Sequence, residues 1–273
     1  MPDRYAVIGN PVAHSKSPLI HAAFAAATDQ AMSYERLLAP RDGFAAAAQR
    51  FASEGGMGLN VTAPFKLDAF ALATERSARA RSAGACNTLA WRGSHWFGDN
   101  TDGAGLIHDL MHNLGMAISG RNVLIFGAGG AARGILGPLL AETPRRVALV
   151  NRTQSKADGL AAHFAAQGDI AAIPSGALGS GRFDIVINAT SIGLQDTDSA
   201  GVWAAGVFAP GALAYDLIYA DAPTPFARWA SANGAARTAD GLGMLIEQAA
   251  ESFLVWRGVR PESAPLFPLL RPV

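Results

Sequence analysis

A glycine-rich turn that follows a short apolar strand constrains the fold of this chain more than any other feature. The strand Val123–Phe126 has the sequence VLIF, the turn Gly127–Ala132 has the sequence GAGGAA, and a helical pattern continues to about Leu140. In such a turn the first glycine permits the tight bend, the second lets the backbone approach a pyrophosphate, and the final alanine lets helix and strand pack closely. Free N–H groups at the start of the helix would face the phosphates. The sequence therefore predicts a dinucleotide-binding βαβ unit.

Strand-like and helix-like segments alternate on both sides of this unit. In the second half, the predicted strands are Asn122–Phe126, Val147–Val150, Asp184–Asn188 and Leu213–Asp216, and the predicted terminal helix is Gly241–Trp256. In the first hundred residues, the predicted strands are Tyr5–Gly9, Tyr34–Leu38 and Met57–Val61, the predicted helices are Pro18–Ala27, Asp42–Ser53 and Glu75–Ala83, and the predicted hairpin joins Thr88–Trp91 to His95–Gly98. Such alternation is typical of parallel α/β sheets, and the hairpin would add an antiparallel edge. Pro138 is expected to kink its helix or to leave one hydrogen bond unmade.

The length of 273 residues suits two domains. The polar, glycine-rich stretch Asp99–Gly105 predicts a boundary. The expected fold class is α/β with an N-terminal parallel-sheet domain and a Rossmann-type domain. Residues 1–102 and 241–273 are assigned to the first domain, and residues 103–240 to the second.

The composition excludes several classes of partner. Lys plus Arg equals Asp plus Glu at 22 each, so the chain offers no broad attraction for nucleic acid or an anionic membrane. No apolar run reaches the roughly 18 residues of a membrane span, and the first residues lack a signal-peptide pattern. Cys86 is the single cysteine, which fits a reducing compartment. The histidines form no metal-binding pattern. We expect a cytoplasmic monomer or homodimer with a small-molecule substrate and neither a nucleic-acid nor a membrane partner.

The end of the next strand indicates which dinucleotide binds. NAD-binding domains carry Asp or Glu at that position, to hold the ribose 2′-hydroxyl. Here the residues are Asn151, Arg152 and Thr153, with Lys156 just beyond. Arg152 and Lys156 could bind a 2′-phosphate, and arginine can do so through two parallel hydrogen bonds. We therefore predict NADP as the cofactor; the alternative is that the two cations are solvated side chains at a helix start.

Two serines near the N-terminus form a candidate anion site. Ser15 and Ser17 would point the same way in an extended segment, and Ser17 with Pro18 also suits the start of a helix. Two hydroxyls at a helix N-terminus can bind a small carboxylate. The alternative is that Ser17 only caps the helix.

Seven short motifs resemble those of the shikimate dehydrogenase family. In order they are Gly9–Pro18 (GNPVAHSKSP), Asn60–Lys66 (NVTAPFK), Gly84–Thr88 (GACNT), Gly98–Gly103 (GDNTDG), Asn151–Thr153 (NRT), Asn188–Ser191 (NATS) and Asp240–Leu245 (DGLGML) followed by Gln248. The resemblance covers about Ile8 to Gln248 without a large gap. It implies a substrate domain, an NADP-binding domain and reversible hydride transfer between NADPH and 3-dehydroshikimate to give shikimate. That step belongs to the biosynthesis of chorismate and the aromatic amino acids.

The resemblance also assigns residues. It implies that Lys66 and Asp102 are catalytic. Reduction of a ketone leaves negative charge on oxygen, so a proton donor is needed. Two roles stay open: Lys66 is the donor and Asp102 orients it, or Asp102 takes part in the relay while Lys66 stabilises the oxyanion.

Further positions follow by the same resemblance. The implied substrate contacts are Ser15, Ser17, Thr62, Asn87, Asp102, Tyr219 and Gln248, with Asn60 as a further polar candidate. The implied cofactor contacts are Gly127, Ala128, Gly129, Gly130, Ala131, Asn151, Arg152, Thr153, Lys156, Leu217 and Gly241. The chain departs from the family at two places: many members carry Arg at the position of Lys156, and some carry Glu at the position of Ala78.

Three alternatives remain. A quinate/shikimate dehydrogenase that uses NAD is disfavoured by the missing acidic residue before Arg152. A non-catalytic sensor of shikimate-like ligands is disfavoured by the presence of Lys66 and Asp102. A two-domain dehydrogenase of a folate or an amino acid is disfavoured by the Ser-Lys-Ser and Asn-Thr-Asp motifs.

Overall fold

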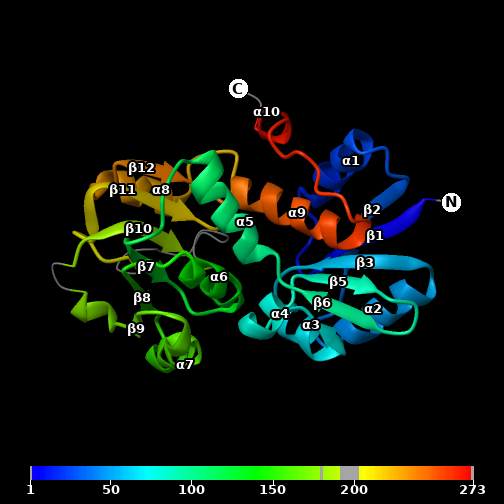
Figure 1. Cartoon of the computed structure of the whole chain (residues 1–273), viewed down its shortest axis with the longest axis horizontal. Helices are drawn as coiled ribbons and strands as arrows, with labels where there is room; N and C mark the ends of the chain where they lie inside the picture. The colour runs from blue at the N-terminus through cyan, green and yellow to red at the C-terminus, as the bar shows by residue number, and fades with distance from the viewer. Residues whose placement is uncertain (1, 179–180, 191–202, 272–273) are drawn as a thin grey trace. The chain divides into compact units, whose positions relative to one another are not determined.

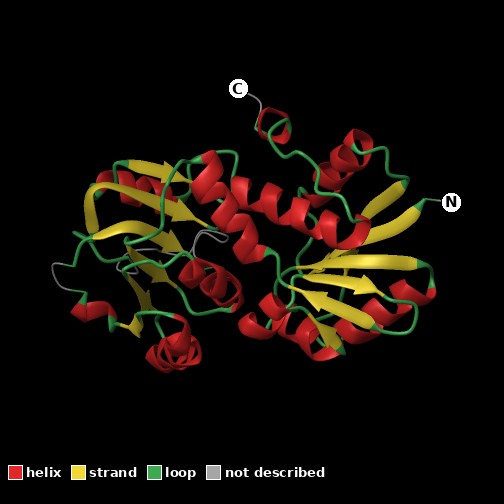
Figure 2. Cartoon of the chain, viewed as in Figure 1, coloured by secondary structure: helices red, strands yellow, loops and turns green. Residues whose placement is uncertain are grey.

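The computed structural model describes residues 2–178, 181–190 and 203–271, which fold into two compact units (Figure 1). The first unit contains residues 1–106 and 245–273, and the second contains residues 107–244. The chain passes between the units within helix α5, Asp102–His108, and within helix α9, Leu242–Arg257. The sequence predicts the domain boundaries after residues 102 and 240, just before these helices. In the structure the chain changes units a few residues later, after residues 106 and 244. In both units strands are flanked by helices (Figure 2).

Among the described residues, the first unit has one six-stranded sheet with the order β2-β1-β3-β5-β6-β4. All its strands run the same way except β5, which is antiparallel to β3 and to β6. Its strands are β1 (Asp3–Gly9), β2 (Met32–Leu38), β3 (Gly56–Val61), β4 (Glu75–Arg76), β5 (Thr88–Trp91) and β6 (Trp96–Asp99). Its other helices are α1 (Ser17–Ala27), α2 (Phe44–Ser53), α3 (Lys66–Leu72), α4 (Ala78–Ala83) and α10 (Leu266–Leu270).

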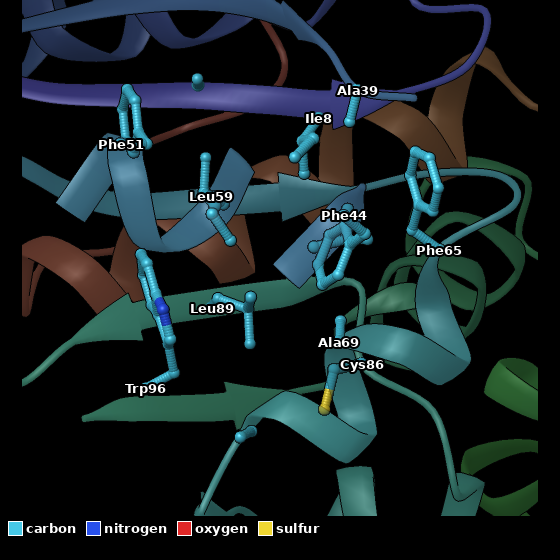
Figure 3. Close-up of a cluster of buried hydrophobic side chains, with 14 of the residues drawn as sticks. Ile8, Ala39, Phe44, Phe51, Leu59, Phe65, Ala69, Cys86, Leu89 and Trp96 are labelled. Atoms are coloured by element: carbon cyan, nitrogen blue, oxygen red, sulfur yellow. The ribbon is translucent and has the colours of Figure 1, made fainter. Parts of the chain in front are cut away.

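Alternate residues of the central strands supply the two faces of this sheet. On one face Ile8 and Leu59 join the side chains of α2, α3 and α4 in a buried cluster (Figure 3). Within that cluster the rings of Phe44 and Phe65 stack with centroids 5.2 Å apart. On the other face Tyr5 packs against Trp256 of α9. The sheet is therefore covered on both sides, and polar residues on the α9 side need partners inside the protein.

Local signals explain a difference from the expected helix at Glu75–Ala83. Glu75 and Arg76 pair with β6 instead, so the hairpin β5–β6 is not the edge of the sheet. The hydroxyl of Ser77 accepts a hydrogen bond from the Ala80 N–H and caps α4. Gly84 ends α4 with a φ of 60°, a conformation that favours glycine.

The second unit has a six-stranded, fully parallel sheet within its described residues, with the order β12-β11-β10-β7-β8-β9. Its strands are β7 (Asn122–Phe126), β8 (Arg146–Val150), β9 (Ile170–Ala172), β10 (Phe183–Asn188), β11 (Phe208–Asp216) and β12 (Arg237–Ala239). Its helices are α6 (Gly130–Ala141), α7 (Gln154–Phe164) and α8 (Pro225–Ala232), with a π-helical turn at Asp109–Asn113 and 3₁₀ turns at Ala165–Gln167 and Ser175–Ala177. This is the strand order of dinucleotide-binding Rossmann domains, in which ligands bind where the chain reverses direction beside the first strand, here β7. Helix α6 continues through Pro138 to Ala141, so the proline does not end it.

No helix in the described part of the chain is long and apolar enough to cross a membrane.

Candidate active site

Lys66 and Asp102 form an ion pair in the first unit. Lys66 is the first residue of α3, and Asp102 is the first residue of α5. The lysine Nζ donates to Asp102 Oδ2 at 2.5 Å. Their side chains are 18% and 7% exposed, so the pair is shielded while the ammonium keeps some access to solvent. Hydrogen bonds between charged groups are short and directional, and groups held in this way can bind a small polar ligand.

Asn87 fixes the other oxygen of Asp102. Its Nδ2 donates to Asp102 Oδ1 at 2.8 Å and to Thr101 Oγ1 at 2.9 Å, and its Oδ1 accepts from the Thr101 N–H at 2.8 Å. The Asp102 N–H donates to Asn100 Oδ1. Both carboxylate oxygens of Asp102 therefore accept hydrogen bonds from fixed donors. Thr101 is a contributor that the residue assignments above omit, although it lies inside the Asn-Thr-Asp motif.

Gln248 reaches the same cluster from α9. Asn87 Nδ2 and Thr101 Oγ1 approach its Oε1 at 3.3 and 3.4 Å, and its Nε2 donates to the Leu245 carbonyl at 2.9 Å. The helices pack closely here, because a Cβ on Gly105 of α5 would lie 2.7 Å from Gln248 Cβ. The structure thus brings Lys66, Asn87, Asp102 and Gln248 together, although Gln248 is far from the others in sequence.

Asn60 lies in a buried polar network on the α9 side of the sheet. Its Oδ1 accepts from Tyr34 Oη at 2.7 Å and from His21 Nε2 at 3.1 Å, and its Nδ2 donates to Ser252 Oγ at 2.8 Å and to Thr88 Oγ1 at 3.3 Å. These four contacts use the full hydrogen-bonding capacity of an asparagine amide. Asn60 therefore links strand β3 to helices α1 and α9 through hydrogen bonds.

His21 gives the first unit a pH-dependent stability. Burial lowers the pKa of His21 to about 3. Its Nε2 donates to Asn60, and within the described residues its buried Nδ1 has no hydrogen-bond partner, so a second proton would be unsatisfied. The folded pKa lies below the unfolded value of about 6.5, so this contribution to stability is complete above pH ~6.5 and is lost as the pH falls toward 3.

We predict that the free energy of unfolding falls by about 1.4 kcal/mol for each pH unit below ~6.5 because of His21. The variant His21→Phe keeps a ring stacked against Tyr34 and should lose this slope. Urea unfolding at a series of pH values measures it. His163→Gln, at an exposed histidine, is the control and should keep the slope. An unchanged slope in His21→Phe would contradict the prediction.

Ser15 and Ser17 lie at the start of α1, where both are buried. The helix begins at Ser17 and has Lys16 as its N-cap, with no side-chain cap, so Ser17 does not cap it. Instead, Ser15 Oγ accepts the Ser17 N–H at 3.3 Å. The guanidinium of Arg36 donates twice to the Ser15 carbonyl, at 3.0 and 2.6 Å, and thereby fixes this turn. The sequence carries no local signal for Arg36, because it comes from a neighbouring strand.

Thr62 follows β3 and is partly exposed. Its N–H donates to the Ile8 carbonyl at 3.0 Å. A Cβ on Gly9 would lie only 2.4 Å from the Thr62 methyl group. Gly9 is therefore needed to let Thr62 approach the end of β1.

The glycine-rich turn in the second unit matches its expected geometry. Gly127 has a φ of 113°, and a Cβ there would lie 2.7 Å from the Ala189 carbonyl oxygen at the end of β10. At Gly129 and Gly130 a Cβ would meet no atom within 4 Å, so this side of the turn is open. Helix α6 begins at Gly130 without a side-chain cap, which leaves N–H groups of its first turn for a ligand. Ala128 and Ala131 complete a turn that fits the pyrophosphate of a dinucleotide.

We predict that Gly127→Ala destabilises the second unit and weakens NADPH binding. An alanine strains a φ of 113° and clashes with backbone rather than with a flexible side chain. The expected loss is about 2 kcal/mol, or several degrees in Tm. Scanning calorimetry with and without NADPH measures both effects. Gly129→Ala has space for its Cβ within the protein and is the control for the Tm without NADPH; equal Tm values for the two variants would contradict the predicted destabilisation.

The end of β8 carries the predicted phosphate-binding cations. Arg152, Thr153 and Lys156 are exposed, and Asn151 Nδ2 donates to the Thr153 carbonyl at 2.9 Å, which shapes the turn before α7. Thr153 is the N-cap of α7 and makes no side-chain cap bond. These residues follow the strand next to β7, at the same sheet edge as the glycine-rich turn.

Leu217, Tyr219 and Gly241 lie beyond the end of β11, also in the second unit. The Leu217 N–H donates to the Asn188 carbonyl at 2.9 Å, and the Gly241 N–H donates to the Ile218 carbonyl at 3.0 Å. A Cβ on Gly241 would lie 2.3 Å from the Leu217 carbonyl oxygen, so only glycine fits there. Tyr219 is partly exposed and lies in this unit, whereas the other predicted substrate contacts lie in the first.

Asp216 anchors that segment, and the residue assignments above omit it. It is fully buried and accepts from Asn188 Nδ2, the Ile218 N–H and Thr224 Oγ1 at 2.9, 3.1 and 2.6 Å. Burial raises the pKa of Asp216, and these hydrogen bonds oppose the rise. In the motif Asn188–Ser191, Ser191 lies outside the described residues.

The described residues include neither a metal-binding cluster nor a reactive thiol. They contain no group of three or more His, Cys, Asp or Glu side chains placed to hold a metal ion. Cys86 is fully buried, and burial raises the pKa of its thiol to about 12. A thiol with so high a pKa is a poor nucleophile at neutral pH.

A Rossmann-type sheet and an α/β unit with a partly buried Lys–Asp pair define a two-domain protein of the nucleotide-dependent dehydrogenase class. Residues 7–89 match the family model described as the shikimate dehydrogenase substrate binding domain. Residues 109–195 match the model described as shikimate / quinate 5-dehydrogenase. The chain belongs to the shikimate dehydrogenase family.

Individual relatives agree over the whole length. A protein of Alkalilimnicola ehrlichii named shikimate dehydrogenase (NADP(+)) is 54% identical, with 100% of each chain covered. The crystal structure of an Ael1 enzyme from Pseudomonas putida is similar, with a TM-score of 0.88, 44% identity and 98% of each chain covered. The shikimate 5-dehydrogenase of Thermus thermophilus, solved with NADP(H) and shikimate, has a TM-score of 0.82 and 33% identity, with 97% of this chain and 96% of that one covered.

Proposed function

We propose that this protein catalyses reversible hydride transfer between NADPH and 3-dehydroshikimate to give shikimate, a step toward chorismate and the aromatic amino acids. The observation that carries the proposal is the Lys66–Asp102 pair, with Nζ and Oδ2 2.5 Å apart, in a chain whose relatives are named NADP-dependent shikimate dehydrogenases. NADPH, when bound, supplies the hydride that a ketone carbon accepts. The protein must then bind the ring, hold the cofactor and deliver a proton to the oxygen.

Lys66 Nζ is the proposed proton donor to the ketone oxygen. Both oxygens of Asp102 accept from groups that only donate, Lys66 Nζ and Asn87 Nδ2, so Asp102 orients the ammonium rather than delivering the proton. Lys66 also stabilises the negative charge that develops on that oxygen. In the reverse reaction the deprotonated Lys66 Nζ accepts the proton of the substrate hydroxyl while the hydride returns to NADP.

The remaining substrate contacts are assigned by chemistry. The hydroxyls of Ser15 and Ser17 bind the carboxylate, because they lie at the N-terminus of α1. The hydroxyls of the ring are bound by the side chains of Thr62, Asn87, Asp102, Tyr219 and Gln248. A site that pairs with each hydroxyl discriminates strongly against analogues lacking one.

The cofactor contacts all lie in the second unit. The backbone of the turn Gly127–Ala131 binds the pyrophosphate. Arg152, with Asn151, Thr153 and Lys156, binds the 2′-phosphate, and Leu217 and Gly241 complete the site beyond β11. We propose further that the enzyme works in the cytoplasm as a monomer or homodimer; its single, buried cysteine suits a reducing compartment.

The direct test is the absorbance of reduced nicotinamide when purified protein is mixed with shikimate and NADP. Shikimate with NAD, and quinate with either cofactor, are the comparison pairs. The proposal requires shikimate with NADP to be much the fastest pair. If quinate or NAD gave the faster turnover, the proposed specificity for shikimate and NADP would be wrong. Shikimate binding without turnover of any pair would indicate a sensor.

A further inference from the structure

Arg79 of α4 makes a forked contact with a carboxylate that the proposed mechanism does not use. Its Nε and Nη2 donate to Asp99 Oδ1 and Oδ2 at 2.7 and 2.8 Å. The Asp99 side chain is 5% exposed, so this pairing compensates a nearly buried charge. Ser77 Oγ, at the cap of the same helix, donates to Asp99 Oδ1 as well.

Asp99 in turn shapes the segment that ends at Asp102. Its Oδ1 accepts the Asn100 N–H at 2.7 Å, and its carbonyl accepts the Asn87 N–H at 3.1 Å. Asn100 Nδ2 donates to the Ala85 carbonyl at 2.9 Å, and Asn100 Oδ1 accepts the Asp102 N–H at 3.2 Å. The position of the Asp102 carboxylate therefore depends on that of Asp99.

The third guanidinium nitrogen of Arg79 extends to a different part of the chain. Nη1 donates to Glu251 Oε2 at 3.1 Å, and Glu251 lies on α9 one helical turn beyond Gln248. On the outer side Arg260 donates to Glu251 and to the fully buried Glu247, at 2.9 and 2.8 Å. One arginine thus joins the segment that carries Asp102 to the helix that carries Gln248.

We infer that Arg79 is a positioning residue for the reaction proposed above, which sets the placement of Asp102 and Gln248 around the Lys66 ammonium. The inference rests on the proposed function and adds a residue that touches neither substrate nor cofactor. Only a planar fork can bond both oxygens of Asp99 and still reach Glu251. A lysine at this position would supply the charge but would lose one of the two partners.

We expect Arg79→Gln to lower kcat per folded molecule about 100-fold, because a displacement of about 1 Å away from the reacting atoms has effects of that size. KM for shikimate should rise by a smaller factor, through the displaced side chains of Asp102 and Gln248. Arg79→Lys should recover only part of the loss, since it restores charge without the fork. Arg81→Gln is the matched control, because Arg81 is an exposed arginine of the same helix and should stay within about twofold of the wild type.

A second measurement does not depend on turnover. Carbon-13 NMR of the Asp102 carboxyl group should show a changed chemical shift in Arg79→Gln but not in Arg81→Gln. A folded Arg79→Gln protein with unchanged kcat and an unchanged Asp102 signal would overturn the inference. A lower Tm with the same kcat per folded molecule would do so too, since the arginine would then be structural only. If the wild type fails to oxidise shikimate, the proposed function is wrong, and the NMR comparison still decides whether Arg79 places Asp102.

Discussion

Lys66→Ala should lower kcat about a thousandfold, within the range for loss of a general acid. The substitution removes the proton donor and the charge that faces the developing oxyanion, while α3 keeps a good helix-forming residue at its start. Substrate affinity should change much less, because Ser15, Ser17, Asn87 and Gln248 remain. Steady-state kinetics with shikimate and NADP, together with calorimetric binding of shikimate, separate the two effects.

The variant Lys66→Arg distinguishes the two roles considered for the pair. A guanidinium keeps the positive charge but does not give up a proton in the accessible pH range. If Lys66 is the proton donor, Lys66→Arg should be nearly as inactive as Lys66→Ala. Substantial activity in Lys66→Arg would favour Asp102 in the proton relay and leave Lys66 as an oxyanion stabiliser. Asp68→Asn, on the exposed first turn of the same helix, is the control and should keep full activity.

The parts of the fold that depend on local sequence were predictable. The turn at Gly127 follows from the steric freedom of glycine and from the strand and helix beside it, and the structure has both. The division into an α/β domain and a Rossmann-type domain is confirmed by the sheets and by the structural relatives. The sequence analysis predicts neither helices α3 and α8 nor strands β4, β9 and β12; each of these three strands has at most three residues, too few for a recognisable alternation.

The candidate site was predictable only in part, because its contacts join distant segments. Nothing in the spacing of Lys66 and Asp102 shows that their side chains meet; the motif resemblance alone connected them, and the structure shows the contact. No sequence pattern indicates that Arg79 contacts Asp99 and Glu251, since ion pairs between segments far apart in the chain leave no local signal. Their roles follow from the geometry of the folded chain.

Arg152→Ala should raise the KM for NADP well above tenfold and leave the KM for NAD almost unchanged. A charge-assisted hydrogen bond contributes about 1.5–3 kcal/mol, and a bidentate contact with the 2′-phosphate uses two of them. NAD lacks that phosphate and therefore loses nothing when the guanidinium is removed. The side chain is exposed at the end of β8, so the substitution should not affect folding. Initial rates at varied NADP and NAD, with shikimate saturating, measure the change.

Arg146→Ala is the matched control for this prediction. Arg146 is an exposed arginine at the opposite end of the same strand, so its loss removes the same charge from the domain far from the predicted phosphate site. Kinetics for both cofactors should then be unchanged. The salt dependence adds a further check, because the wild-type preference for NADP should weaken as ionic strength rises, whereas that of Arg152→Ala should change little. If Arg152→Ala still strongly prefers NADP over NAD, the prediction is wrong, and Lys156 and Thr153 would be the residues that recognise the 2′-phosphate.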